Sequence, residues 1–187
     1  MTEIRPGGPC RCDERRLETC SVVGCSIAPS DTLFSGPPCS RGVPTEIRQA
    51  RPEEASALDI LRRQAIEATY SVPLDRSSFA DLVATPDAAL AERIANPDWR
   101  VVVAATTNAQ AGYAVFDRDR RQVTGVYVAP HRQCEGLGSA LLDRLLDDGP
   151  VGADAPNPVA GFFEANGFER TGSTTWNGLD AVSLRRP

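Results

Sequence analysis

The residues best suited to chemistry form a loop between an expected strand and an expected helix, residues 133–139, with glycines at Gly136 and Gly138. The first backbone N–H groups of a helix have no partner inside it, and the helix dipole makes that end positive. The two glycines lack the Cβ atoms that would keep a ligand at a distance. The loop is therefore expected to bind a phosphate or pyrophosphate, although a simple strand-to-helix turn would show the same residues.

Two common phosphate-binding motifs do not fit this loop. A Walker loop requires a lysine after its last glycine, and the chain contains no lysine. A Rossmann fingerprint requires a third glycine where Leu141 stands, and it opens a βαβ unit, whereas this loop lies late in the chain. A different phosphate-containing ligand is therefore expected.

The two elements on either side of the loop have clear sequence signals. Val126 and Val128 favour an extended backbone, and Pro130 cannot donate a ladder hydrogen bond, which predicts a strand over 122–128. After the loop, apolar residues recur at helical spacing, and Gly149 with Pro150 would end that helix. Its expected apolar face is Leu137, Ala140, Leu141, Leu142, Leu145 and Leu146, and its expected polar face is Asp143, Arg144, Asp147 and Asp148.

The remaining elements follow a mixed order. Strands are expected over 46–50, 100–105, 111–116, 151–153, 168–175 and 179–184, with a turn at Asn177-Gly178 between the last two. Helices are expected over 52–70, 75–84, 86–94 and 158–166. The short connections between residues 100 and 128 imply antiparallel pairing. The expected fold class is α+β, with a mixed, mostly antiparallel sheet flanked by helices.

Two stretches together resemble the signatures of the GNAT superfamily of N-acetyltransferases. Residues 133–138, Gln-Cys-Glu-Gly-Leu-Gly, resemble the family's Gln/Arg-x-x-Gly-x-Gly/Ala signature, and residues 126–130 resemble its central strand with a terminating proline. Residues 162–168, Phe-Phe-Glu-Ala-Asn-Gly-Phe, resemble its second signature in the branch with a Phe-Phe pair. The resemblance extends from about Thr45 to the C-terminus and implies an acyl-CoA N-acyltransferase fold over residues 44–187.

The resemblance implies acetyl-CoA as the co-substrate and places its pyrophosphate on the loop. The residues implied to bind it there are Arg132, Gln133, Cys134, Glu135, Gly136, Leu137, Gly138 and Ser139. The pantetheine arm would add beside the preceding strand along Val126, Tyr127 and Val128, and Phe163 belongs to the same cofactor-binding set. Gly136→Asp is expected to abolish CoA binding with little change in thermal stability.

The proton-transfer groups are where this chain departs from the family pattern. Many members have a tyrosine that protonates the departing CoA thiolate, but the corresponding residue here is Phe163. The strand over 122–128 contains no glutamate that could act as a base, so no catalytic residue is assigned. Tyr70 and Tyr113 are candidates for contact with the acceptor, and half-buried aromatics with hydroxyls in water are the alternative.

The implied function is transfer of an acetyl group from acetyl-CoA to a primary amine of a small molecule or protein by direct transfer. The alternative is a CoA-binding regulator or interaction module of the same fold with little or no turnover. Phe163 and the missing base keep this alternative open. Release of the CoA thiol with a panel of amines would separate the two.

Composition limits the partners. The formal net charge of −5 and the lack of a basic patch argue against nucleic acid, and no apolar run is long enough to span a membrane. The first residues lack the apolar core of a secretory signal, so a cytoplasmic location is expected. Exposed sheet edges would allow a homodimer. No metal is expected, because the single histidine, His131, lies in a loop between Pro130 and Arg132.

Residues 1–43 differ in composition from the rest of the chain. They contain five of the six cysteines and many prolines, glycines and serines, without a sustained helical or strand period. Four thiolates could bind zinc, but the cysteine spacing matches no familiar set, and disulfides would need an oxidising compartment. A poorly ordered extension is expected instead.

Overall fold

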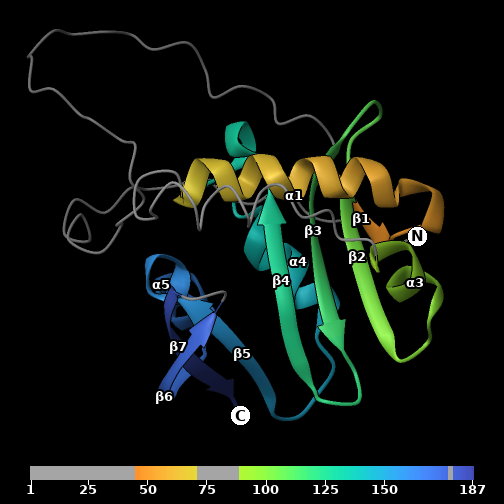
Figure 1. The fold of residues 1–187 in the computed structure, drawn as a ribbon. Helices are drawn as coiled ribbons and strands as arrows, with labels where there is room; N and C mark the ends of the chain where they lie inside the picture. Colours follow the sequence, from red (N-terminus) through yellow and green to blue (C-terminus); the bar gives the residue numbers. More distant parts are fainter. Residues whose placement is uncertain (1–44, 71–88, 177–178) are drawn as a thin grey trace, which may run out of the picture. The chain divides into compact units, whose positions relative to one another are not determined.

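The computed structural model describes residues 45–70, 89–176 and 179–187, and Figure 1 shows their arrangement. The strands are β1 Glu46–Gln49, β2 Trp99–Ala105, β3 Gln110–Asp117, β4 Gln122–Val128, β5 Val151–Pro156, β6 Glu169–Trp176 and β7 Leu179–Arg186. The α-helices are α1 Ala55–Tyr70, α3 Leu90–Ala95, α4 Leu137–Leu145 and α5 Asn157–Ala165. Two short 3-10 helices are η2 Pro52–Glu54 and η3 Pro130–Arg132.

The strands of the described residues form one sheet in the order β1-β2-β3-β4-β5-β7-β6. β1 to β4 pair antiparallel with their neighbours, as the short connections between β2, β3 and β4 predict. β5 joins β4 in parallel after the crossover through α4, and β7 and β6 complete the sheet antiparallel. The expected α+β class with a mixed, mostly antiparallel sheet is confirmed.

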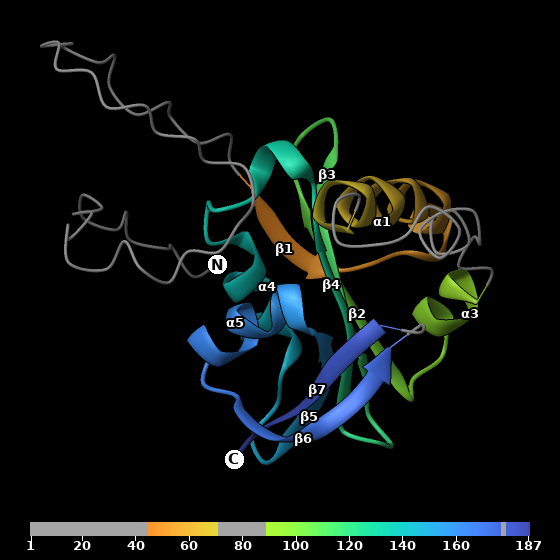
Figure 2. The same cartoon turned by 60° about the vertical axis from the view of Figure 1, so that its left-hand side comes forward.

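The helices cover opposite faces of the sheet (Figure 2). Successive side chains of β2 point to opposite faces, so Val102 joins a core with α4 and α5, whereas Val101 and Val103 join a core with α1 and α3. The first core contains Leu141, Leu142, Leu145, Ala160 and Phe163, and the second contains Leu58, Leu61, Leu90, Ile94 and Tyr113. We call these the α4/α5 face and the α1/α3 face.

The entry to α1 is fixed by the carboxylate of Glu54. This carboxylate accepts two hydrogen bonds from the Arg48 guanidinium, at 2.8 and 2.9 Å, and one from the Arg51 backbone N–H at 2.9 Å. The Arg48 guanidinium lowers the pKa of Glu54 from 4.5 to about 2, because these donors favour the charged form. The contact therefore joins β1 to the start of the helical segment.

The helix after the loop is shorter than the sequence predicts. α4 ends at Leu145 rather than running to Gly149, so Asp147 and Asp148 do not lie on its polar face. Arg100, on β2, donates to the Leu145 carbonyl at 2.9 Å and to the Asp147 carboxylate at 2.6 Å. A side chain from a distant strand thus satisfies the last turn of the helix, which local spacing cannot reveal.

Several expectations concern residues that the structure does not describe. The extension over 1–43, the helix over 75–84, the first residues of the helix over 86–94 and the Asn177-Gly178 turn all lie outside the described residues. Within the described ranges, no helix is long and apolar enough to cross a membrane.

Candidate functional site

The loop before α4 opens toward space in front of the helix. Gly136 precedes the helix with φ 79°, a left-handed conformation that L-residues rarely adopt. A Cβ built on Gly136 would meet nothing within 4 Å. The expectation that Gly136→Asp leaves thermal stability almost unchanged is therefore wrong, because any side chain at this φ strains the backbone.

The start of α4 presents a run of backbone N–H groups without acceptors. The first intrahelical bond of α4 joins the Ala140 N–H to the Gly136 carbonyl at 3.1 Å, so Leu137, Gly138 and Ser139 have no intrahelical acceptor. Among the described residues, no acceptor pairs with the N–H groups of Cys134, Glu135 or Gly136 either. Together with the helix dipole, these donors match an anionic group such as a diphosphate.

The polar side chains of the loop bond to the protein itself. The Arg132 guanidinium pairs with Glu135 at 2.7 Å and donates to the Thr45 hydroxyl at 3.3 Å. The Gln133 amide donates to the Val128 carbonyl at 3.3 Å. Cys134 is exposed and has φ 62°. The loop conformation is thus held by side chains and leaves the backbone donors to face outward.

Gly138 serves a packing role that the sequence alone did not indicate. A Cβ on Gly138 would lie 2.8 Å from Cε2 of Phe162, so the Phe162 ring of α5 occupies the space that a side chain at this position of α4 would take. Phe163 packs edge-on against Phe162 and Phe168, with ring centroids 5.1 and 5.4 Å apart, and is buried in the α4/α5 core. In this position it contributes apolar contact and no proton.

β4 has an unpaired edge beside the loop. β5 pairs with β4 only at Gln122 with Gly152 and Val123 with Ala153, and the two strands then diverge (Figure 1). The β4–β5 ladder ends at Val123, so residues 124–128 of β4 lie beyond its last pair. This edge is about 13 Å long at 3.3 Å per residue, so an extended molecule could add to it as a strand would.

Aromatic side chains gather on the α1/α3 face of the sheet. Tyr70, at the end of α1, stacks on Trp176 of β6 with centroids 5.9 Å apart. Burial raises the pKa of the Tyr70 hydroxyl, and nearby Tyr127 raises it further. The ring centroids of Tyr127 and Tyr113 lie 5.1 Å apart. The prediction that Tyr113 contacts the acceptor is wrong, because its side chain is fully buried in the sheet.

Asp154 of β5 lies in a small polar network that the sequence analysis missed. Its carboxylate accepts from the Gln122 amide on β4 and from the Ser183 hydroxyl on β7, each at 2.7 Å. The strand predicted from the sequence ends at Ala153, so the prediction does not extend the in–out alternation of side chains to Asp154. The signal was present in the continuation Ala153-Asp154-Ala155, which alternates apolar and polar residues.

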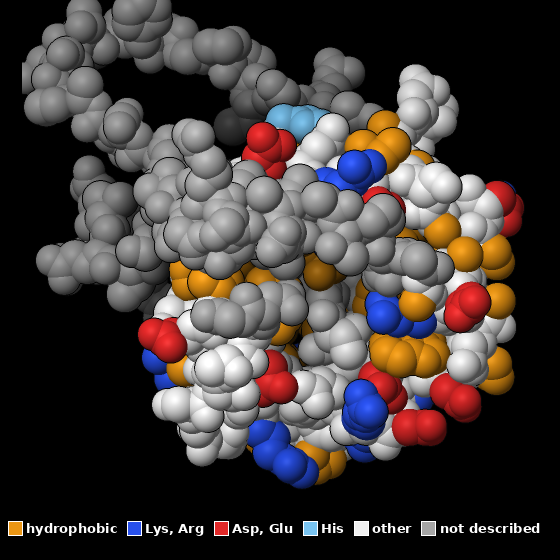
Figure 3. Space-filling model, in the orientation of Figure 1, with side chains coloured by type: hydrophobic (Ala, Val, Ile, Leu, Met, Phe, Trp, Pro, Cys, Tyr) orange, Lys and Arg blue, Asp and Glu red, His pale blue; other side chains and the backbone are white. Residues whose placement is uncertain are grey.

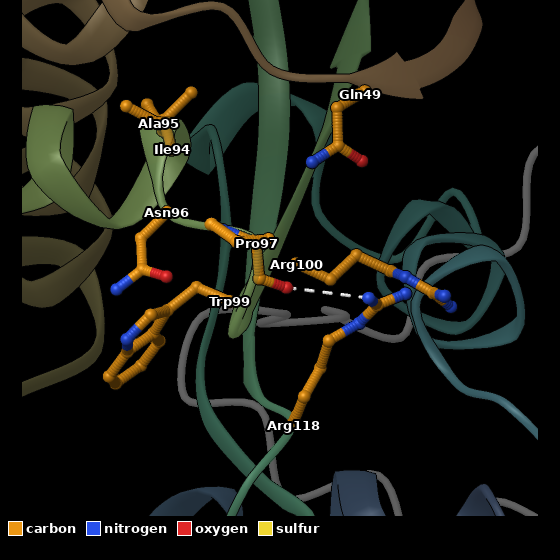
Figure 4. A pocket seen from close by; sticks show the side chains of 8 residues that line it. All are labelled: Gln49, Ile94, Ala95, Asn96, Pro97, Trp99, Arg100 and Arg118. Carbon is orange, nitrogen blue, oxygen red and sulfur yellow. Dashed lines mark hydrogen bonds between the residues drawn. The ribbon is translucent and has the colours of Figure 1, made fainter.

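A cavity of about 240 Å³ lies at the opposite end of β2 from the loop. Figure 4 shows its lining residues, Gln49, Ile94, Ala95, Asn96, Pro97, Trp99, Arg100 and Arg118. Arg118 donates to the Pro97 carbonyl at 3.3 Å, and Arg100 is bound to Asp147. This cavity contains none of the loop residues, and its two arginines have partners within the fold, so we do not assign the site there.

The described residues offer no metal centre. They contain no group of three or more His, Cys, Asp or Glu side chains placed to hold an ion. His131 is exposed, and the histidine-coloured side chain lies at the surface in Figure 3. Its expected exposure is confirmed, but it lies in the short helix η3 rather than in a loop.

Comparisons with known proteins agree with this geometry. A family model described as acetyltransferase (GNAT) domain matches residues 58–185. The Mycobacterium tuberculosis protein named "Probable N-acetyltransferase Rv2775" is 30% identical over 98 residues, which cover 46% of this chain and 56% of that relative. The chain thus spans little more than half the length of this relative.

Solved structures share the fold over about three quarters of this chain. A GCN5-related N-acetyltransferase from Rhodopseudomonas palustris superimposes with a TM-score of 0.65 at 19% identity, covering 75% of this chain and 94% of that chain. PaiA N-acetyltransferase from Thermoplasma acidophilum, in complex with coenzyme A, superimposes with a TM-score of 0.63 at 15% identity, covering 76% of this chain and 98% of that chain. The protein yncA from Salmonella typhimurium, provisionally described as an acetyltransferase, was solved with acetyl-CoA. It superimposes with a TM-score of 0.56 at 25% identity, covering 75% of this chain and 92% of that chain.

Proposed function

This chain belongs to the GNAT acetyltransferase family, and from that premise we propose that it transfers the acetyl group of acetyl-CoA directly to a primary amine of a small molecule or protein. The observation that carries the proposal is the run of acceptor-free N–H groups at residues 134–139, beside the unpaired edge of β4. Backbone N–H donors beside a strand edge that lies beyond the β4–β5 ladder suit a ligand with a diphosphate and a long flexible arm.

The chain's residues have distinct roles in this proposal. The N–H groups from Cys134 to Ser139 would bind the diphosphate, because the Gln133 N–H donates to the Pro130 carbonyl at 3.4 Å. The edge of β4 along Val126, Tyr127 and Val128 would pair with the arm. Arg132 and Gln133 hold the loop through Glu135 and the Val128 carbonyl. Acetyl-CoA, when bound, supplies an activated thioester. A backbone N–H near Val128 would donate to its carbonyl oxygen as negative charge develops there.

The reaction balances without a metal. The acceptor ammonium first gives one proton to water, and its nitrogen then attacks the thioester carbonyl carbon. The N–C bond forms, the C–S bond breaks, and the thiolate leaves with the electron pair. The nitrogen releases its second proton to water, and the thiolate takes a proton from water. Positioned acid or base groups typically contribute about 10²–10⁴-fold, so Phe163 in place of an acid slows the reaction without preventing it.

The acceptor would approach on the α1/α3 face, where Tyr70 and Trp176 stack. Tyr70 comes from the end of α1 and Trp176 from the tip of the β6–β7 hairpin, so both lie on elements outside the CoA loop. Tyr70 is buried and Trp176 is half-buried, so the Trp176 ring, on which Tyr70 stacks, would offer the apolar surface for the body of an acceptor.

A second function, CoA binding with little turnover, is favoured by one observation. Phe163 is buried in the core and cannot supply the proton that a tyrosine would. Release of the CoA thiol from acetyl-CoA with a panel of primary amines separates the two functions: release supports the transferase, and binding without release supports the regulator.

The phosphate seat is tested with a matched pair of variants. Asn and Asp tolerate the left-handed conformation better than most residues, so Gly136→Asn and Gly136→Asp should lose similar stability. Only Asp adds negative charge. Two unit charges about 6 Å apart repel by about 3 kcal/mol at an effective dielectric constant of about 20, and screening on an exposed loop reduces this.

We therefore expect Gly136→Asp to bind CoA about ten- to hundredfold more weakly than Gly136→Asn in isothermal titration calorimetry. Equal affinity of the two variants would show that the diphosphate does not lie at the start of α4. Melting temperatures of the two variants serve as the control for folding.

A further inference from the structure

We propose that Asp154 binds the ammonium form of the acceptor amine, an inference that rests on the proposed acetyl transfer. Side chains from three neighbouring strands meet at this carboxylate. The Gln122 amide of β4 donates to Oδ2 and the Ser183 hydroxyl of β7 donates to Oδ1, both at 2.7 Å. The two donors fix the orientation of an otherwise exposed side chain.

Strand alternation places this network on the α1/α3 face. Val151, Ala153 and Ala155 of β5 are buried in the core under α4 and α5, so Asp154 points to the other side of the sheet. The same holds for Gln122, which precedes the buried Val123, and for Ser183, which lies between the buried Val182 and Leu184. The carboxylate therefore lies on the face that also presents Tyr70, Tyr127 and Trp176.

The network stands where β4 and β5 begin to separate. Their ladder ends with Val123 and Ala153, so Asp154 is the first residue of β5 beyond it. A thioester bound along the unpaired edge of β4 would be reached from the α1/α3 face through this opening. The opening brings an amine held by Asp154 to the edge where the acetyl group would lie.

The partners of Asp154 leave its charge available. Both are neutral donors, and no arginine among the described residues forms a salt bridge with it. Asp59, Asp117 and Asp147, by contrast, each pair with an arginine. A carboxylate has about four lone-pair sites, and two hydrogen bonds leave the others open to the N–H donors of an ammonium group.

The class of acceptor follows from this charge. A primary alkyl amine is cationic at neutral pH and would gain a charge-assisted hydrogen bond from Asp154. An arylamine is neutral and would not. Because Asp154 is exposed, the proton that the ammonium must lose before attack can pass to water.

The test compares amine binding by three proteins saturated with CoA: the wild type, Asp154→Asn and Asp180→Asn. The Gln122 amide and the Ser183 hydroxyl can each rotate to present an oxygen, so asparagine at 154 can keep its hydrogen bonds. Asp180 is an exposed acid of β7, two residues before Val182, so its side chain points to the same α4/α5 face as Val182 and away from Asp154. It is therefore the control. The probes are putrescine, tyramine and spermidine, with aniline as the neutral amine.

By calorimetry we expect Asp154→Asn to bind at least one alkylammonium probe about ten- to hundredfold more weakly than the wild type and Asp180→Asn. Affinity for CoA, affinity for aniline and the melting temperature should not change. In turnover, KM for the amine should rise far more than kcat falls. Equal affinity of Asp154→Asn and wild type would overturn the inference, and so would the absence of alkylammonium binding to the CoA-saturated wild type.

Failure of the proposed function would look different. It would appear as no CoA binding, or as no thiol release with any amine, aniline included. In the second case the amine titration on the CoA-saturated proteins still decides the role of Asp154, and in the first case the same titration is made on the three proteins without CoA.

Discussion

Replacing Gly138 by alanine should destabilise the protein, although alanine is the better helix former. The added Cβ would lie 2.8 Å from Cε2 of Phe162, closer than real Cβ contacts come, and 3.1 Å from Cζ, which is tighter than most. Overpacking of this kind costs about 1–3 kcal/mol. Replacing glycine by alanine in a helix stabilises the folded state by about 0.5–1 kcal/mol through helix propensity. We expect a net loss of about 1 kcal/mol and a melting temperature about 2–4 °C lower.

Gly161→Ala is the matched control, because it makes the same exchange in α5 where a Cβ meets nothing within 4 Å. It should gain the helix-propensity term alone and melt slightly above the wild type. The difference between the two variants therefore isolates the clash with Phe162, at about 1–3 kcal/mol. Urea unfolding of both proteins at neutral pH measures it.

A double-mutant cycle identifies the partner. In a Phe162→Leu background the shorter side chain removes the obstructing ring atoms, so Gly138→Ala should cost less there than in the wild type. If Gly138→Ala proves as stable as Gly161→Ala, or costs the same with and without the Phe162 ring, the packing role of Gly138 is wrong.

Three further predictions concern other parts of the fold. Cys134→Gly should stabilise the protein by about 1 kcal/mol in urea unfolding, because Cys134 has φ 62°, and it should leave CoA affinity unchanged; weaker binding would mean that the thiol takes part. Glu54→Gln should destabilise the folded protein most at neutral pH, because the pKa of Glu54 is lower in the folded state than in the unfolded state. The deficit relative to wild type should shrink as the pH falls from 4.5 to about 2, and a deficit independent of pH would contradict the Arg48–Glu54 account. Arg100→Met removes the donors to Leu145 and Asp147, so it should lower the melting temperature more than Arg118→Met, which removes a hydrogen bond of 3.3 Å to the Pro97 carbonyl. Equal shifts would show that Arg100 does not hold the end of α4.

Features with local causes could be predicted from the sequence. β4 has the predicted bounds, Gln122 to Val128, because β-branched residues and Pro130 define both its conformation and its end. The loop and the start of α4 at Leu137 also agree, since glycine spacing and helical periodicity are read within a few residues. The antiparallel pairing of β2, β3 and β4 follows from their short connections.

Features that depend on distant partners could not be predicted. The apolar pattern of α4 continues to Leu146, but Arg100 from β2 satisfies the helix end one residue earlier. The contact between Gly138 and the Phe162 ring could not be predicted, because Phe162 lies on another helix; the cofactor-binding role of Gly138 stays a prediction. Asp154 escaped notice because its two partners come from β4 and β7, which only the sheet order brings together.

The central claim is that the backbone N–H groups of residues 134–139 hold the diphosphate of coenzyme A. Nitrogen–proton correlation NMR during a titration with CoA observes those groups individually. The account predicts that the largest shifts fall on the amides of residues 134–139, with smaller shifts along Val126 to Val128. Saturable CoA binding that leaves these amides unchanged, or shifts centred on the cavity beside Arg100 and Arg118, would contradict it.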